Sequence, residues 1–418
     1  MRYTFKHTIY SAYLGYITQA IIVNLSPLLF VTFVARLGLS LTQLGLLISL
    51  NFGVQIVTDL IAIKFIDRLP TFRAPVVAAH VLAAVGLVSL GVLPFMMPPY
   101  LGICLATVLM AIGGGLIEVV VSPLVESCPG EAKASAMSLL HAFYCWGQVG
   151  VVVLSTLFFL FVSTAHWYVL PLLWAIVPAF NVLLLRKVPM NPLVAEGDQI
   201  VPVSRLFGVK IFWILLMLMI GAGASELAMC QWASLFAESG LGVSKTVGDL
   251  LGPCAFALLM GVTRTFYGTK GAKIKLSRFM ILSAVLCVLS YLLAVFAPHP
   301  LLSLVGCALC GLSVGIMWPG TISLAAEAYP QGGGAMFAIL ALAGDLGCSV
   351  GPALVGAISA RVIANGTADA GANLTEMGLK TGLGWALLFP VMVIGGVMWL
   401  RRAKKREDSQ PQGFTPQS

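Results

Sequence analysis

Twelve apolar stretches of roughly 20 residues constrain the fold of this chain more than any other feature. A helix of about 20 apolar residues crosses a hydrocarbon core near 30 Å thick, and in lipid the backbone polar groups must bond within their own helix unless a barrel closes. The composition agrees, because only 10% of the 418 residues are charged and 59% are hydrophobic. We therefore predict an all-α membrane protein with 12 transmembrane helices, over residues 9–35, 42–65, 75–95, 101–125, 134–161, 167–185, 209–237, 246–267, 277–297, 301–326, 335–361 and 380–400.

The basic residues lie asymmetrically about these segments. If both termini are cytoplasmic, all but four of the 24 lysines and arginines fall on the cytoplasmic side, the exceptions being Arg36, Lys245, Arg361 and Lys380. This asymmetry follows the positive-inside rule, and such residues contact anionic lipid head groups. The net charge of +8 is therefore interpreted as a topology signal, and no nucleic acid is expected as a partner. We predict a multi-pass protein of the cytoplasmic (inner) membrane with both termini in the cytoplasm.

A polar, proline-containing linker divides the chain into two halves of six segments each. The predicted units are an N-terminal six-helix bundle (1–185), a cytoplasmic linker (186–208), a C-terminal six-helix bundle (209–400) and a basic cytoplasmic tail (401–418). A shift of 201 positions superimposes Gly114 on Gly315, Ser122 on Ser323, Glu126 on Glu327 and Gly150 on Gly351. Two parallel repeats around a central site are the architecture of secondary transporters. We expect two pseudo-symmetric bundles and a monomeric carrier.

The stretch after the second segment resembles the charged loop of the major facilitator superfamily. "IKFIDRLPTFR" retains Asp67, Arg68 and Arg73, and the corresponding stretch of the second half, "GVTRTFYGTKG", retains Arg264. The resemblance implies the 12-helix major facilitator fold and a latch that clasps one gating conformation. Asp59, near the cytoplasmic end of its segment, is assigned to the same latch. Topology charges alone are the simpler alternative for this loop.

Three other stretches resemble the fucose and hexose permease branch of that superfamily and the sodium-dependent glucose transporter-like carriers. "GGGLIEVVVSPL" places Glu118 at a membrane glutamate position, "SLLHAFYCWG" places His141 at a polar site, and "GASELAMCQW" supplies Glu226 and Trp232. The resemblance implies symport of a sugar with an ion. "QAIIVNLSPLL" in the first segment departs from the fucose-type pattern, because it offers Gln19 and Asn24 where an aspartate is expected. Proton and sodium both stay open as the coupling ion.

Four acids lie well inside the predicted spans, namely Asp59, Glu118, Glu226 and Asp345. An ionised acid near the bilayer centre costs about 3 kcal/mol on insertion scales, so such residues face a cavity or a partner. We expect no lysine or arginine at their depth, which favours carboxyls that take up and release protons. Glu118, Glu226 and Asp345 are the candidate ion-coupling residues, and the carbonyls in "AGDLGCS" around Asp345 would also suit sodium. A structural hydrogen bond between helices is the alternative for Glu118, and the substrate site is the alternative for Asp59.

Amides, a histidine and tryptophans in the spans are candidates for substrate contact. His141, Cys145 and Gln148 share one helical face, because they are spaced i, i+4 and i+7, and that face predicts the polar wall of a cavity. Packing within the interior is the alternative reading for the histidine and for each tryptophan. The candidate substrate-binding residues are Gln19, Asn24, His141, Trp146, Gln148, Gln231, Trp232 and Trp318.

These patterns predict a secondary active transporter that moves a small polar solute, in the first instance a monosaccharide, with H+ or Na+ as the coupling ion. A proton-driven exporter of amphipathic compounds is the alternative, and a large apolar cavity with one acid would favour it. An enzyme is not expected, because the sequence contains no HExxH, GxSxG or phosphate-loop motif. No cofactor and no metal are expected beyond the coupling ion.

Overall fold

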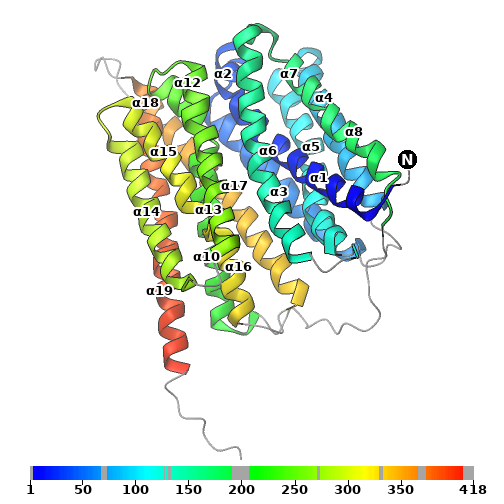
Figure 1. Ribbon diagram of the computed structural model, residues 1–418. Coiled ribbons are helices and arrows are strands. Elements are labelled where there is room, and N and C mark those ends of the chain that lie inside the picture. The colour runs from blue at the N-terminus through cyan, green and yellow to red at the C-terminus, as the bar shows by residue number, and fades with distance from the viewer. Residues whose placement is uncertain are drawn as a thin grey trace, which may run out of the picture.

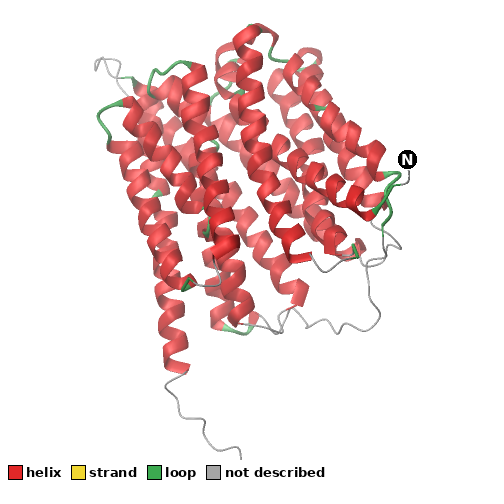
Figure 2. Cartoon of the chain, viewed as in Figure 1, coloured by secondary structure: helices red, strands yellow, loops and turns green. Residues whose placement is uncertain are grey.

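The structure, a computed structural model, describes residues 3–66, 73–126, 128–129, 133–190, 207–270, 274–328, 333–365 and 373–407. Within these ranges the regular elements are helices, and strands are absent (Figure 2). Asp67 and Arg68 of the predicted latch, and most of the predicted linker and tail, lie outside the described residues.

The first half of the chain forms one group of helices (Figure 1). Pro27 lies inside the first helix, and its missing N–H accompanies a 44° bend before the second helix, so the two together resemble one broken span. The helices of this half are α1 (Phe5–Leu28), α2 (Phe30–Leu37), α3 (Leu41–Ile66), α4 (Arg73–Met96), α5 (Pro99–Glu126), α6 (Lys133–Phe161), the short 3-10 turn η1 (Thr164–His166), α7 (Val169–Trp174) and α8 (Ile176–Leu185).

The second half forms a matching group beside the first (Figure 1). Two of its spans contain five-residue π-helical turns, η2 and η3, of the kind that often occurs at functional sites. The elements are α10 (Lys210–Cys230), α11 (Ala233–Leu235), η2 (Phe236–Gly240), α12 (Lys245–Asp249), η3 (Leu250–Cys254), α13 (Ala255–Lys270), α14 (Leu276–Phe296), α15 (Pro300–Val314), α16 (Met317–Ala328), α17 (Gly333–Asn365), α18 (Leu374–Ala386) and α19 (Leu388–Glu407).

The described helices occupy all twelve predicted apolar segments. By length and composition ten continuous helical stretches can cross a membrane, the bent pair α1 and α2 provides an eleventh, and Val169–Leu185 is a shorter apolar helix in the range of the sixth predicted segment. The prediction of an all-α, multi-pass membrane protein is therefore confirmed.

The two halves pack closely at the end of the molecule that carries α2 and α12 (Figure 1). Glycines make this possible, because a Cβ added at Gly356 of α17 would lie 3.2 Å from the Cα of Gly45 in α3. One turn farther along, Ser49 Oγ donates to the carbonyl of Ser349 at 3.3 Å. Lys245 Nζ of α12 donates to the carbonyl of Leu28 at 3.0 Å. We call this end the closed end.

Candidate transport site between the two halves

A cavity of about 120 Å³ lies where the two halves meet. Eight helices contribute to its wall, α1, α3, α5 and α6 from the first half and α10, α13, α16 and α17 from the second. Polar and aromatic side chains dominate the described lining, which consists of Tyr16, Gln19, Val23, Phe52, Ile117, Glu118, His141, Tyr144, Glu226, Leu227, Arg264, Trp318, Asp345 and Cys348. The position between the halves is the one expected of a transport site.

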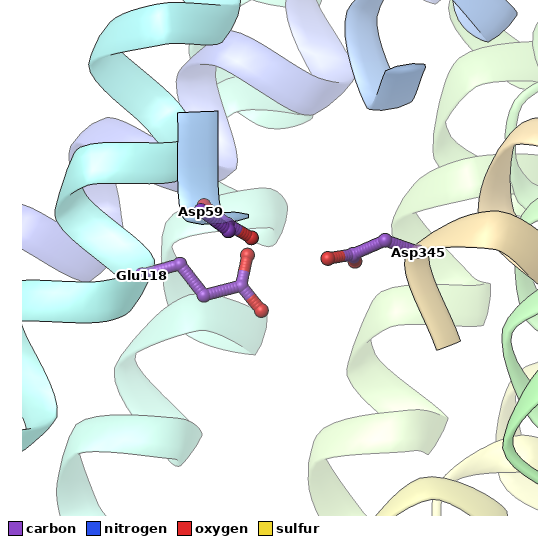
Figure 3. A group of neighbouring side chains, drawn as sticks. All are labelled: Asp59, Glu118 and Asp345. Carbon is purple, nitrogen blue, oxygen red and sulfur yellow. The ribbon is translucent and has the colours of Figure 1, made fainter. Parts of the chain in front are cut away.

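Three carboxyl groups converge beside this cavity, and we call Asp59, Glu118 and Asp345 the carboxylate cluster (Figure 3). One oxygen of each lies within 4.8 Å of the others. Asp59 is on α3 and Glu118 on α5, whereas Asp345 faces them from α17 of the other half. The cluster therefore joins the two halves through side chains of like charge.

Glycine and burial explain how the carboxylate cluster is held. A Cβ added at Gly115 would lie 2.7 Å from Asp59 Oδ1, so the missing side chain lets α3 approach α5. Asp59 and Asp345 are 4% and 3% exposed, and Oδ1 of Asp59 and Oδ2 of Asp345 have no hydrogen-bond partner. Since adjacent carboxylates cannot all ionise without a compensating charge, this arrangement suits protons or one hard cation with oxygen ligands.

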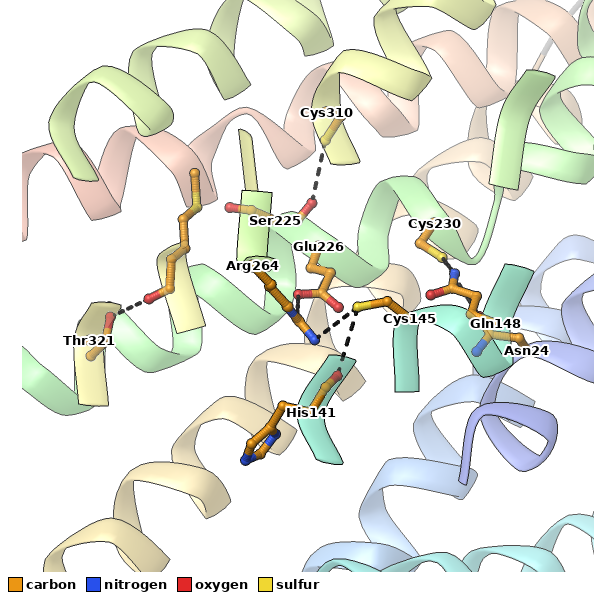
Figure 4. A network of polar contacts seen from close by, with 11 residues as sticks. Asn24, His141, Cys145, Gln148, Ser225, Glu226, Cys230, Arg264, Cys310 and Thr321 are labelled. Carbon is orange, nitrogen blue, oxygen red and sulfur yellow. Dashed lines mark hydrogen bonds and ion pairs between the residues drawn. The ribbon is translucent and has the colours of Figure 1, made fainter. Parts of the chain in front are cut away.

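A buried ion pair also lines this cavity, between Arg264 of α13 and Glu226 of α10 (Figure 4). Arg264 Nη2 donates to Glu226 Oε2 at 3.2 Å, and Nη1 donates to Cys145 Sγ of α6 at 3.5 Å. Arg264 is the single lysine or arginine among the described lining residues. The prediction that no basic residue shares the depth of the membrane acids is therefore wrong for Glu226.

The assignment of Arg264 to a latch loop is corrected by the same geometry. The helix α13 continues to Lys270, so Arg264 lies within the helix rather than beyond it. Burying an isolated charge costs several kcal/mol, and an acid at the facing position offsets that cost. The side chain thus faces Glu226 and the cavity.

Asp59 is likewise displaced from the predicted latch. The helix α3 continues to Ile66, about two turns past Asp59, and the carboxyl joins the carboxylate cluster. Arg73, at the start of α4, donates to the carbonyls of Leu185 and Val188 at 2.7 and 2.8 Å. Arg73 therefore holds the end of α8 within its own half, and among the described residues it forms no hydrogen bond or ion pair with the other half.

Six of the predicted substrate-binding and ion-coupling residues reach the cavity, in addition to Arg264. Gln19 donates from Nε2 to Gln55 at 2.8 Å, and its own Oε1 has no partner. His141 is exposed to solvent although it lines the cavity, and its ring meets Tyr16 edge to face at 5.4 Å. Solvent therefore reaches the cavity beside His141. The six are Gln19, Glu118, His141, Glu226, Trp318 and Asp345.

Two predicted tryptophans lie elsewhere. Trp146 is 48% exposed and does not line the cavity, because it occupies a different face of α6 from His141. Trp232 is fully buried, and its Nε1 donates to the carbonyl of Pro352 at 3.0 Å. A Cβ added at Gly356 would lie 2.8 Å from the Trp232 ring. Trp232 therefore packs at the closed end and does not line the cavity.

Three predicted amides also lie beside the cavity rather than on its wall. Gln148 Nε2 contacts Cys230 Sγ at 2.9 Å, and Asn24 donates to the carbonyl of Ala20 at 2.9 Å. Gln231 donates to the carbonyl of Val23 at 3.3 Å. Gln148 and Gln231 each join the two halves, so these amides support the interface toward the closed end.

The cavity also contains residues that the sequence reasoning missed, notably Tyr144 and Ile117. The internal repeat contains a signal for both. The same shift of 201 positions pairs Tyr144 with Asp345 and Ile117 with Trp318, and all four line the cavity. Equivalent positions in the two halves therefore face the same space.

Comparison with known proteins agrees with this architecture. The family model of the Major Facilitator Superfamily matches residues 12–352 and 254–416. These matches span well over half of the chain, which therefore belongs to the Major Facilitator Superfamily. The members of this family are transporters, and the predicted family is confirmed. The comparison with curated proteins found no match.

Several solved structures share the fold over almost the whole chain. A bacterial homologue of the human lysosomal transporter Spinster, inward-facing and occupied, has a TM-score of 0.75 at 14% identity, covering 97% of this chain and 98% of its own. A D-xylose-proton symporter has a TM-score of 0.73 at 16% identity, covering 94% and 95%. The transporter FucP, in the outward conformation, has a TM-score of 0.63 at 14% identity, covering 94% and 98%.

Proposed function

We propose that this chain is a secondary active transporter that moves a small polar solute, in the first instance a monosaccharide, coupled to H+ or Na+. The observation that carries the proposal is the cavity between the two halves, which is lined by Glu118 and Asp345 of the carboxylate cluster and by the Arg264–Glu226 ion pair. Each ion-binding group contacts both halves, so its occupancy can bias how they close.

The size and lining of the cavity support a small hydroxylated solute. Pockets for drug-sized ligands measure about 300–1,000 Å³, whereas this cavity measures about 120 Å³. Gln19, His141 and Tyr144 offer hydrogen bonds, and Trp318 offers a flat ring of the kind on which sugars pack. A small cavity with clustered polar groups fits the exporter alternative less well. The fold neighbours include a D-xylose-proton symporter and the E. coli fucose:proton symporter FucP.

The carboxylate cluster supplies the coupling step in this proposal. When the three carboxyls lack a cation, Asp345 repels Asp59 and Glu118 across the interface between the halves. A bound proton or sodium ion removes this repulsion and favours conformations in which the halves stay close at the cluster. A ligand shifts such an equilibrium only through its different affinities for the two states. Ion binding and substrate binding would therefore be linked through the same interface.

The membrane and the orientation of the chain are also part of the proposal. The positive-inside pattern supports cytoplasmic termini and a location in the cytoplasmic (inner) membrane. With that orientation the closed end faces outward, and the cavity beside His141 faces the cytoplasm, an inward-facing state. We propose a monomeric carrier whose partners are its substrate, its coupling ion and the lipid bilayer, without a cofactor.

The proposal is tested by thermal unfolding of the purified protein in detergent and by uptake into proteoliposomes. The panel contains hexoses, pentoses, deoxyhexoses and lipophilic cations, each with H+ or Na+ gradients. A ligand at about a hundred times its dissociation constant stabilises the protein by about 2.7 kcal/mol. We expect Glu118→Gln to lose gradient-driven accumulation but to keep exchange of substrate across the membrane.

Glu376→Gln is the matched control, because Glu376 is partly exposed and pairs with Lys380 one turn away on α18. This variant should accumulate substrate like the unchanged protein. Stabilisation by lipophilic cations alone would instead favour the exporter. Full accumulation by Glu118→Gln would remove Glu118 from the coupling step.

A further inference from the structure

The guanidinium of Arg264 is only partly satisfied. An arginine presents five N–H donors in a fixed planar fork. The hydrogen bonds from Arg264 are one to Glu226 Oε2, at 3.2 Å, and one to the thiol of Cys145, a weak acceptor (Figure 4). Its Nε is buried and has no hydrogen-bond partner. Glu226 thus accepts a hydrogen bond from Nη2 but not from Nε, the other donor on the same edge of the guanidinium.

A single contact of this kind is unusual for a buried arginine. Arginine and carboxylate pairs prefer two parallel hydrogen bonds, and unpaired donors in a low-dielectric interior are costly. A purely structural ion pair would gain by closing into the two-bond form. The open fork beside a cavity therefore indicates a second acceptor that arrives with the ligand.

We propose that the transported solute carries a carboxylate, so that the substrate class is a small hydroxylated acid such as a hexuronate or an aldonate. This inference rests on the proposed transport function and deepens it. The substrate carboxylate takes both oxygens to the fork of Arg264 and displaces Glu226. Its hydroxyl groups face Gln19, His141 and Tyr144, which line the cavity from the first half.

Charge balance assigns a proton to the same step. Before binding, the positive Arg264 and the negative Glu226 sum to zero. The incoming carboxylate takes the place of Glu226, whose carboxylate accepts one proton from solution and becomes neutral. The site again sums to zero, and no net charge is left at a depth where each charge costs about 3 kcal/mol. One proton therefore enters with each substrate anion.

The location of the pair connects this exchange to gating. Arg264 and Glu226 belong to α13 and α10 of the second half, whereas Cys145 belongs to α6 of the first. A carboxylate on the Nε–Nη2 side leaves Nη1 in contact with the thiol, so the guanidinium that binds the substrate also contacts the first half. A ligand bound here thus acts on the same interface as the carboxylate cluster.

The experiment compares D-glucuronate with D-glucose, since these two sugars share their ring and differ in the carboxylate, and adds D-gluconate. Thermal unfolding in detergent and uptake into proteoliposomes are both measured. We expect the sugar acids to stabilise the unchanged protein and D-glucose to do so at least about tenfold more weakly. Arg264→Gln should weaken sugar-acid binding by about 100-fold or more, Arg264→Lys should retain part of it, and Glu376→Gln should leave it unchanged.

A second readout follows the proton. In weakly buffered detergent solution, a pH dye should report one proton taken up for each sugar acid bound, and Glu226→Gln should bind the acid without that uptake. If Arg264→Gln does not fold, the neutral pair Arg264→Gln with Glu226→Gln takes its place. A structural role alone would leave the proton count unaffected.

The outcomes separate this inference from the proposed function. Binding of neutral sugars equal to or tighter than that of the acids would overturn the inference and leave sugar transport standing. Binding of lipophilic cations alone would overturn both. Failure of the sugar acids to bind at all, or unchanged binding in Arg264→Gln, would also overturn the inference.

Discussion

The two charged groups at the cavity both contain acids from the membrane spans but differ in electrostatics. The carboxylate cluster has three acids, and none of Asp59, Glu118 and Asp345 has an ion-pair partner among the described residues. The Arg264–Glu226 pair has one acid and one base in contact. One group is deficient in positive charge and the other is neutral. Burial alone therefore does not determine which ligand a membrane acid can bind. The charge of its nearest neighbour determines it.

This difference assigns the two groups to different ligands. A cluster of carboxylates gains from a cation, because a proton or metal ion relieves repulsion between its members. A neutral ion pair contains no like-charge repulsion for a cation to relieve, but its arginine can exchange one carboxylate for another when the displaced glutamate takes up a proton. A carrier with both groups can bind a cation at the cluster and a substrate carboxylate at the pair, where the proton taken up by Glu226 keeps the pair neutral.

Breaking the ion pair should have the largest effect on stability. Arg264→Gln leaves Glu226 buried without its partner, and removal of one member of a buried pair costs about 3–5 kcal/mol. The measurement is the unfolding temperature in detergent, converted with the unfolding enthalpy. The double variant with Glu226→Gln removes both charges and should recover most of the loss. Equal instability of the single and double variants would show that the charge pairing is not what stabilises this region.

Neutralising the carboxylate cluster should change stability in the opposite direction. In the absence of sodium, Glu118→Gln and Asp345→Asn each remove one like charge from a group with oxygens within 4.8 Å, and each should stabilise the protein by about 1–3 kcal/mol. Added sodium should stabilise the unchanged protein more than either variant. Glu376→Gln, in the ion pair on α18, is the control and should change stability by less than about 0.5 kcal/mol. Destabilisation by both cluster variants would contradict the contrast between the two groups.

Displacing one acid without changing its charge gives a sharper test. A Cβ at Gly115 would meet Asp59 Oδ1 at 2.7 Å and the Cβ of Thr58 at 3.0 Å, so Gly115→Ala should push Asp59 away from Glu118. Overpacking of this kind costs about 1–3 kcal/mol, against a gain of up to about 1 kcal/mol in helix propensity. We expect a net loss of about 1 kcal/mol and weaker stabilisation by sodium. Gly53→Ala on α3, with nothing within 4 Å of the new Cβ, should be neutral or slightly stabilising and should keep the sodium response.

The helices were predictable from the sequence because lipid imposes one strong rule on backbone hydrogen bonds. Length and hydropathy alone therefore gave the spans, and the acids Glu118, Glu226 and Asp345 were found because charge in an apolar span is rare. The loop resemblance misplaced Arg264, although position 264 lies inside the predicted segment 246–267 and α13 continues past it to Lys270. Asp59 likewise lies inside the predicted segment 42–65, and it was assigned to the latch because it lies toward the cytoplasmic end of that segment. Hydropathy and motif resemblance do not show which neighbour a side chain faces.

The direction of each side chain was the second feature that could not be predicted from the sequence. Trp146, Trp232 and Trp318 look alike as aromatic residues in spans, yet only Trp318 lines the cavity. The direction of each depends on a few degrees of helix rotation and on close contacts such as that of Trp232 with Pro352. A period of 3.6 residues sorts the residues into faces, but it does not say which face meets the other half.

The tryptophans provide the finest test of where the cavity ends. Trp318 of α16 lies against the backbone at Gly344, next to Asp345 of the carboxylate cluster, so Trp318→Phe should open space beside that acid. We expect a several-fold rise in the substrate concentration for half-maximal uptake and a loss of about 1 kcal/mol in stability. Trp146→Phe makes the same chemical change at a side chain that is 48% exposed, and uptake and stability should both stay within error, about 0.5 kcal/mol for the latter. If Trp146→Phe reduced uptake as much as Trp318→Phe, the wall of the cavity would have to include the outer face of α6, and the carboxylate cluster would no longer mark one side of the substrate site.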